Sequence, residues 1–305
     1  THSTFQLTLV LVGLCFFGSM FITNDVSLLT FVPFTFVVLS RLGADVRRSL
    51  LIPVVCMQTI AANLGSMLTP IGNPQNLYLY GKSGMSIGGF VLLMLPYTLV
   101  SLLLLLAWAA LVCRKASAAL SVDELVSSSA SQGDQKIILL YLVLFAVCLL
   151  SVIRVLPYGI AFAAVLVCAL FADPRTLRAV DYSLLLTFVA FFIFIGNLGR
   201  IPAFSGWLQE FLTGREVLVA VLASQVTSNV PAALLLSGFT AETQALIIGT
   251  NLGGLGTLIA SMASLISYRQ IARELPQGKK QYFGLFTLSN LIFLAILLGV
   301  WFLLC

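Results

Sequence analysis

Long apolar runs separated by short polar bunches constrain this chain more than any other feature of its sequence. The runs are roughly 18–25 residues long, the length that a helix needs to cross the hydrocarbon of a bilayer. Only 9% of the residues are charged and 60% are hydrophobic, whereas soluble domains carry about 25% charged residues. The sequence therefore predicts an all-α polytopic membrane protein, and it excludes a soluble enzyme, a disordered chain and a nucleic-acid-binding protein.

Apolar segments can be located along the whole chain, and two of them contain residues that break helices. The segments are expected at 5–22, 26–40, 50–80, 87–113, 137–153, 157–172, 182–199, 217–240, 243–267 and 282–304. Segment 50–80 is interrupted at Gly65, Pro70, Gly72 and Pro74, and segment 243–267 at Gly249, Gly253, Gly254 and Gly256. The serine-rich stretch 114–136 predicts a cytoplasmic linker, and 203–216 predicts a short amphipathic helix along the membrane interface.

Charge placement indicates how the segments cross the membrane. When 217–240 enters and returns as a hairpin, with Ser228 and Asn229 at its tip, twelve of the 16 basic residues lie on the cytoplasmic side. A single crossing would place more of them outside, so the excess of basic residues inside favours the hairpin. A similar hairpin is expected over 5–40, with Thr23-Asn24-Asp25 at its tip. The first hairpin then opens to the cytoplasm and the second to the outside, as an inverted pair.

The two broken segments also align with each other without a gap. Residues 63–80 lie over 251–268, so that Asn63-Leu64-Gly65 matches Asn251-Leu252-Gly253. A hairpin followed by a broken helix, repeated with inverted topology, is typical of transporters, whose broken helices point N-termini at anions and offer freed carbonyls to cations. The two repeats would be 1–113 and 137–305. Because the first repeat has almost nothing before its hairpin, either about three scaffold helices precede Thr1 or the protein has lost them, and we favour the first.

At these residues the chain resembles the ion transporter superfamily, which includes divalent anion/sodium symporters, citrate permeases and arsenite-efflux permeases. The symporters carry Ser-Asn-Thr at each hairpin tip and a turn similar to Gly-Thr-Pro-Pro-Asn in the first broken helix. The chain has Thr23-Asn24-Asp25 and Ser228-Asn229-Val230 at the tips, and Gly72-Asn73-Pro74-Gln75-Asn76 at the turn. The resemblance spans nearly the whole chain and implies a homodimer in which a transport domain moves as an elevator against a scaffold.

The chain departs from the symporter pattern at three places. Asp25 replaces a neutral hydroxyl residue and is more similar to the arsenite-efflux group. Val230 removes a hydroxyl group, and 260–264 has no Pro-Pro turn. These departures count against a di- or tricarboxylate substrate held with two sodium sites of the symporter type.

Asp25 is the residue with the largest expected role, because a carboxylate deep in a membrane is costly unless it pairs with a cation, a proton or a donor. We expect it to ligate sodium or to carry the coupled proton; the alternative is that it caps the second helix of its hairpin. The amides of Asn24 and Asn229 can donate to an anion and ligate a cation. For these two residues the alternative is capping alone.

The candidate site residues supply amides, hydroxyls, helix N-termini or freed carbonyls. The substrate is expected to contact Asn24, Thr69, Asn73, Pro74, Asn76, Ser228, Asn229, Thr257 and Ser261. A cation is expected to contact Thr23, Asn24, Asp25, Asn63, Gly65, Gly72, Ser228, Asn229, Asn251, Gly253 and Gly256. No Arg or Lys is expected at the site, which favours a small or weakly charged anion. No cofactor is expected beyond a bound sodium ion.

These residues predict a secondary active transporter of the cell membrane that moves a small carboxylate or oxyanion together with sodium or protons. A sodium/proton antiporter that uses Asp25 and an arsenite-type efflux permease are the alternatives, and a passive channel is a weaker one. No enzyme is expected, because the chain has neither H-E-x-x-H nor G-x-S-x-G and no His at membrane depth. The expected partners are the anion, the lipid bilayer and a second copy of the chain, but no nucleic acid.

Overall fold

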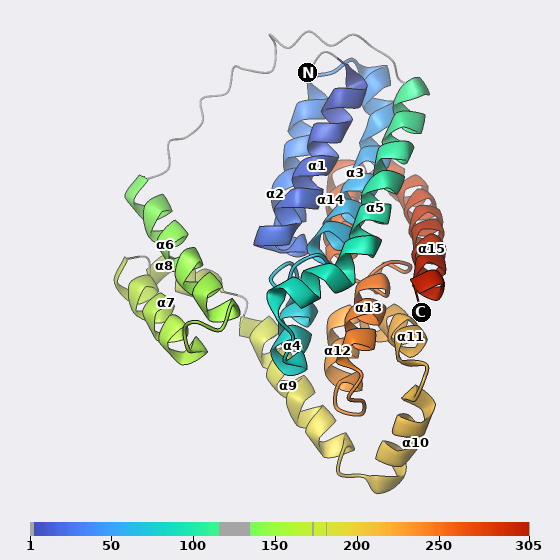
Figure 1. The fold of residues 1–305 in the computed structure, drawn as a ribbon. Coiled ribbons are helices and arrows are strands. Elements are labelled where there is room, and N and C mark those ends of the chain that lie inside the picture. Colours follow the sequence, from blue (N-terminus) through green and yellow to red (C-terminus); the bar gives the residue numbers. More distant parts are fainter. Residues whose placement is uncertain (1–2, 116–134, 173, 181, 305) are drawn as a thin grey trace. The chain divides into compact units, whose positions relative to one another are not determined.

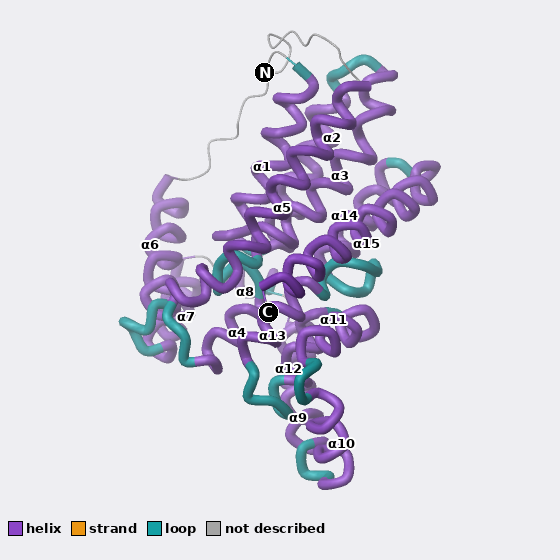
Figure 2. Tube along the Cα trace, turned by 45° about the vertical axis from the view of Figure 1, so that its right-hand side comes forward, coloured by secondary structure: helices purple, strands orange, loops and turns teal. Residues whose placement is uncertain are grey.

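The computed structural model describes residues 3–115, 135–172, 174–180 and 182–304. Regular structure in these residues is helical, with no β-strand among them (Figure 1, Figure 2). The all-α class expected from the sequence is thus confirmed for this part of the chain, whose apolar helices are those of a multi-pass membrane protein. The linker expected over 114–136 lies mostly outside the described residues. Two compact units are present, Thr1–Val126 with Ile195–Cys305, and Ser127–Phe194.

The larger unit starts with a helical hairpin and a broken helix. Its first helices are α1 (Thr4–Ile22), α2 (Asn24–Ser40), α3 (Ala44–Ser66), α4 (Pro74–Ser83) and α5 (Ile87–Lys115). Thr23 alone joins α1 to α2. The break between α3 and α4 contains Pro70, whose missing N–H cannot continue the helical ladder.

The later part of the larger unit repeats this order. It contains α10 (Pro202–Leu212), α11 (Glu216–Thr227), α12 (Asn229–Leu236), α13 (Thr243–Leu252), α14 (Met262–Glu274), the 3-10 turn η2 (Pro276–Gly278) and α15 (Lys279–Leu304). Ser228 alone joins α11 to α12. The break between α13 and α14 includes Gly256, whose φ of 111° is a conformation that L side chains rarely adopt.

The hairpins and broken helices pack crosswise in the larger unit. Helix α1 packs on α3 and α11 on α13, so each hairpin contacts the broken helix that follows it. The second segments cross over: α14 packs on α2 and α3, whereas α4 packs on α12 and α13 (Figure 1). Helices α5 and α15 contact α3 and each other. This exchange brings the two helix breaks and the two hairpin tips into one region.

Two glycines permit the closest helix contacts in this arrangement. A Cβ atom at Gly65 of α3 would collide with the backbone carbonyl of Phe16 in α1. A Cβ atom at Gly253, the matching residue after α13, would lie 2.6 Å from Oγ of Ser224 in α11. Real Cβ atoms essentially never come this close to other heavy atoms. A side chain at either position would therefore push the hairpin away from its broken helix.

The smaller unit consists of α6 (Gln135–Val152), α7 (Tyr158–Ala172), α8 (Pro174–Ala179) and most of α9 (Tyr182–Leu198). Helix α6 packs on α7, and the hydroxyl of Tyr141 donates to Thr176 Oγ1 at 3.1 Å. Apolar side chains such as Phe162 and Phe171 are exposed on these helices. Exposed apolar faces of this kind suit contact with lipid or with further protein.

Four helices in the described residues are long and apolar enough to cross a membrane: Thr4–Ile22, Ala44–Ser66, Ile87–Arg114 and Pro276–Leu304. A fifth span results if the bent pair Leu185–Leu198 and Pro202–Leu212 is counted as one. All the apolar segments expected from the sequence coincide with helices, with shifted bounds. Helix α10 stands where an amphipathic helix was expected over 203–216, and its Trp207 is exposed.

The glycine contacts yield a stability prediction. Replacing Gly65 or Gly253 by Ala should lower the free energy of unfolding by about 1–3 kcal/mol, because the added methyl group overpacks a close helix contact. Gly13→Ala is the matched control, since a Cβ at that position in α1 meets no atom within 4 Å. Thermal unfolding of the purified protein in detergent measures the difference. A Gly65→Ala variant that melts together with Gly13→Ala would contradict the packing argument.

Candidate functional site

The two hairpin tips share an unusual backbone conformation. Thr23 has φ 71° and ψ 155°, and Ser228 has φ 76° and ψ 154°. Among the described residues, Arg154 is the one other non-glycine residue with positive φ. This region of φ and ψ is almost restricted to glycine and costs about 1–3 kcal/mol for other residues, a strain found preferentially at functional sites. The matching strain at two distant points therefore marks the tips as candidates for function.

Each tip is held by the broken helix that follows it. The backbone N–H of Asn24 donates to the carbonyl of Gly72 at 3.1 Å, and that of Asn229 donates to the carbonyl of Ala260 at 3.0 Å. Gly72 and Ala260 occupy matching positions in the alignment of 63–80 with 251–268. Two N–H groups at helix starts, which have no partner within their own helix, are thereby satisfied by carbonyls freed at the breaks.

Side chains join the two broken helices to each other. Oδ1 of Asn63 in α3 accepts from Ser261 Oγ at 3.0 Å, and Oδ1 of Asn251 in α13 accepts from Asn73 Nδ2 at 3.2 Å. Ser261 and Asn73 are the N-cap residues of α14 and α4. Asn63 also accepts from Asn24 Nδ2 at 3.1 Å, so the first tip belongs to the same network. The structure thus brings the predicted amides at positions 24, 63, 73 and 251 together.

Further predicted residues surround this network. Asn76 Oδ1 accepts from Asn251 Nδ2 at 2.6 Å, and Thr69 Oγ1 donates to the carbonyl of Met20 at 2.6 Å. Thr257, which matches Thr69, donates to the carbonyl of Gln225 at 3.1 Å and is exposed. Pro74 is the first residue of α4 and donates no hydrogen bond, so it shapes the helix start.

Two atoms of the network are buried and have no hydrogen-bond partner among the described residues: Oδ1 of Asp25 and Nδ2 of Asn63. The first is an acceptor and the second is a donor. Asn63 is 5% exposed, whereas the Asp25 side chain as a whole is half-buried. Buried polar atoms nearly always have a partner, so these two are among the positions at which the site can receive one.

The capping alternatives can be compared with the observed bonds. The side chain that caps α2 is Thr23 Oγ1, which accepts from Val26 N at 3.5 Å, so the Asp25 carboxylate does not take that role. Asn24 uses its amide to reach Asn63 in another helix. No side chain caps α12 at Ser228. The described side-chain contacts of Asn24 therefore extend beyond capping, because its amide reaches another helix.

Sequence reasoning missed three residues at the site. Ser66 Oγ accepts from Asn73 Nδ2 at 3.1 Å. Gln75 in the first turn of α4 is 1% exposed, and neither atom of its amide has a partner among the described residues. Gln225 bonds several backbone groups of the second break. Gln225 could have been recognised from the sequence, because a glutamine inside an apolar membrane segment often has a functional role.

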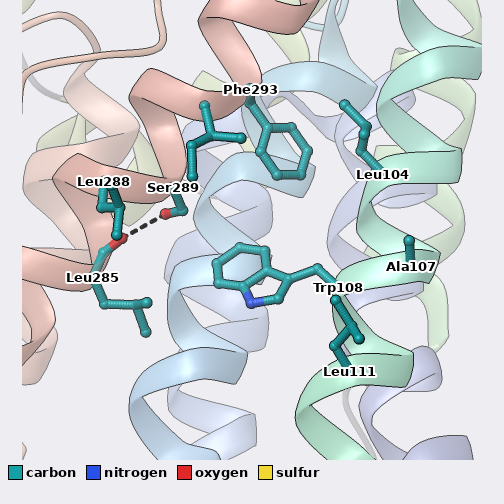
Figure 3. A pocket seen from close by; sticks show the side chains of 9 residues that line it. Leu104, Ala107, Trp108, Leu111, Leu285, Leu288, Ser289 and Phe293 are labelled. Atoms are coloured by element: carbon teal, nitrogen blue, oxygen red, sulfur yellow. Dashed lines mark hydrogen bonds between the residues drawn. The ribbon is translucent and has the colours of Figure 1, made fainter.

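An apolar groove of about 360 Å³ lies apart from this network, between α5 and α15 (Figure 3). Trp108 and Leu104 line it from α5, and Leu285, Leu288 and Phe293 line it from α15. The hydroxyl in its lining, Ser289, donates to the carbonyl of Leu285 at 2.7 Å, and Trp108 adds one indole N–H. An apolar groove with a single indole donor and a hydroxyl that is already bonded is a poor place for an ion, so it is not the candidate site.

Comparison with known proteins relates the chain to membrane transporters. A family model described as "Citrate transporter" matches residues 1–245. The inner membrane protein YbiR of Escherichia coli is 34% identical over 259 residues, an alignment that covers 82% of this chain and 66% of that protein. The uncharacterized transporter MJ0456 of Methanocaldococcus jannaschii is 31% identical over 264 residues, covering 87% of this chain and 70% of that protein.

The chain therefore spans about two thirds of the length of these curated relatives. Its match to the family model covers most of its own residues, including both hairpin tips and the first helix break. The matches bear out the resemblance to the ion transporter superfamily that rests on the tip and turn residues. The chain belongs to the citrate transporter family of membrane proteins.

Proposed function

We propose that the protein is a secondary active transporter that moves a small carboxylate or oxyanion across the cell membrane, coupled to sodium ions or protons. The observation that carries this proposal is the pair of buried atoms that lack partners among the described residues, Asn63 Nδ2 and Asp25 Oδ1. Asn24 connects them, because it donates to Asn63 and directly precedes Asp25 in the chain. An unmet donor suits an anion, whereas an unmet carboxylate oxygen suits a cation or a proton.

The ends of four helices support an anion site. Helices α2, α4, α12 and α14 all begin at the tips and breaks: α2 at Asn24 and α12 at Asn229, α4 after its cap Asn73 and α14 after its cap Ser261. A helix N-terminus carries partial positive charge and free N–H groups, which bind anions without a full positive charge. The described members of the network include no Arg or Lys. The buried amide of Gln75 would add a further donor or acceptor for the substrate.

The matching bonds in the two halves support an inverted repeat of a hairpin and a broken helix, with the substrate between them. In this scheme 1–113 and 137–305 are the repeats, 114–136 is a cytoplasmic linker, and the bound anion moves with the hairpins as an elevator. A homodimer would supply the fixed scaffold. The name of the family model makes citrate the first substrate to test. Anions of lower charge, such as succinate and sulfate, suit a site without Arg or Lys better than a tricarboxylate does.

Asp25 also supports a second candidate function, sodium/proton exchange. A carboxylate whose buried oxygen lacks a partner among the described residues can bind sodium and a proton in turn. Anion transport requires an anion to bind, whereas sodium/proton exchange does not. Measurements of anion binding therefore distinguish the two functions.

Binding of ion and anion can be tested by thermal shift of the purified full-length protein in choline buffer. Sodium is added alone, and then with citrate, succinate, sulfate, phosphate or arsenite. A ligand that binds the folded state raises the melting temperature by mass action. We expect sodium or a lower pH to stabilise the protein and one anion to stabilise it further. Stabilisation by sodium without any anion effect would favour exchange, and counterflow in proteoliposomes would distinguish a carrier from a channel.

Replacement of Asp25 by Asn should abolish the dependence of transport on the coupling cation while leaving the fold intact. The two side chains have the same shape, but the amide has no negative charge to balance a cation and does not take up a proton. Uptake is measured against sodium concentration and pH, with Asp45→Asn at an exposed position of α3 as the matched control. An unchanged ion dependence in the Asp25→Asn variant would remove Asp25 from the mechanism.

The asparagines of both tips should be required for transport if the two halves share one site. Asn24→Ala and Asn229→Ala are each expected to reduce the initial uptake rate about five- to a hundredfold, because a buried hydrogen-bonding group worth about 1–3 kcal/mol is lost from the site. Asn197→Ala, at an exposed position of α9, is the control. Full activity in either tip variant would mean that only one half forms the site.

A further inference from the structure

The side chain of Gln225 in α11 lies where three backbone carbonyls meet. Its Nε2 donates to the carbonyl oxygens of Val221 at 3.2 Å, Gly253 at 3.0 Å and Leu255 at 2.9 Å. Its Oε1 accepts from the N–H of Thr257 at 2.9 Å. These partners fix the orientation of the amide, because a flipped amide would place Oε1 against three carbonyl oxygens.

Carbonyl oxygens that converge at a broken helix are groups with which transporters coordinate cations. Gly253 and Leu255 follow the C-terminus of α13, where the helix dipole is negative, and Val221 belongs to the adjacent hairpin helix. The Nε2 of Gln225 donates to these oxygens without adding a net charge. It therefore occupies the place among the three carbonyls that a bound cation would otherwise take.

The first half of the site is built differently at the matching positions. When the hairpin tips Thr23 and Ser228 are aligned, Met20 corresponds to Gln225 and Asp25 corresponds to Val230. The backbone contact is the same in both halves, since Thr69 Oγ1 donates to the carbonyl of Met20 as Thr257 Oγ1 does to that of Gln225. Methionine has no N–H or O–H to donate. The first half thus has an acid at its tip, and the carbonyls of Met67 and Thr69 in its break accept from Asn76 Nδ2 at 3.5 and 3.3 Å. The second half has a donor on its hairpin helix and no acid at its tip.

We propose that the carboxamide of Gln225 takes the place of a cation in the second half, so that the coupling cation binds only in the first half, next to Asp25. This inference rests on the proposed function, because it assigns the coupling ion to one of two related positions. The alternative is that the Gln225 amide only stabilises the second helix break. In that case, mutation of Gln225 would destabilise the break, and added cations would not restore its stability.

The test is Gln225→Glu in the full-length protein, which keeps the shape of the side chain and removes its donor. A carboxylate then faces three carbonyl oxygens, so the variant should melt below the parent in choline buffer. Sodium or calcium at about 100 mM should raise its melting temperature by at least about 3 °C more than it raises that of the parent. Gln209→Glu, at an exposed position of α10, has the same change of charge and is the control.

The proposal is overturned if Gln225→Glu gains no more from either cation than the parent and Gln209→Glu do. Should that variant yield no folded protein, Gln225→Met, which copies the residue of the first hairpin, is the second test. Removal of the amide then leaves the three carbonyls available, and the same additional stabilisation by sodium is expected. An unchanged response of this variant to sodium would equally contradict the proposal.

The result is independent of transport, so it can be separated from the proposed function. If the parent shows neither cation nor anion stabilisation and no transport, the proposed function is wrong. The response of the Gln225 variants would still decide whether their three carbonyls form a cation position. If the parent transports and the Gln225 variants show no additional cation response, only the inference about Gln225 is wrong.

Discussion

Backbone groups that are freed where a helix breaks inside an apolar environment need partners from the protein itself, because hydrocarbon offers none. Here the partners come from the hairpin tips and from the opposite broken helix. Asn24 and Asn229 donate their backbone N–H groups to the breaks, and the N-caps Asn73 and Ser261 reach asparagines of the other half. These backbone and side-chain bonds therefore stabilise helix breaks that would otherwise be too costly in an apolar environment.

The same bonds explain why strained residues persist at the tips. The backbone of Thr23 and Ser228 is unfavourable by itself, but the following residue is fixed to the break and the hairpin is fixed to its broken helix through a glycine contact. Because α4 and α14 exchange partners between the halves, the two tips and the two breaks form one connected body. Such a body can carry a ligand without rearranging its binding groups, which is the mechanical requirement of an elevator movement.

Much of this could be predicted from residue types alone. Gly, Pro and Asn within apolar runs located the breaks near Gly72 and Gly256 and the tips at Thr23 and Ser228, because such residues have few other reasons to interrupt membrane helices. The crosswise pairing could not be predicted, since it depends on which helices approach one another in space. Gln225 was not assigned a role for a related reason, and Gln75 was named in the turn motif without one. The sequence alone reveals neither the direction in which a glutamine points nor the carbonyls within its reach.

The differences between the halves are as informative as their likeness. Asn251 in the second half has partners for both atoms of its amide, whereas Nδ2 of Asn63 has none among the described residues. The acid stands in the first half, and the second supplies its own donor through Gln225. Two equivalent halves would bind either two cations or none. The positive charge of two cations would then have to be offset by a substrate of higher negative charge. If one half is closed by an amide, as we propose, a single cation at Asp25 would leave the site close to neutral, and its helix N-termini would suit an anion of low charge.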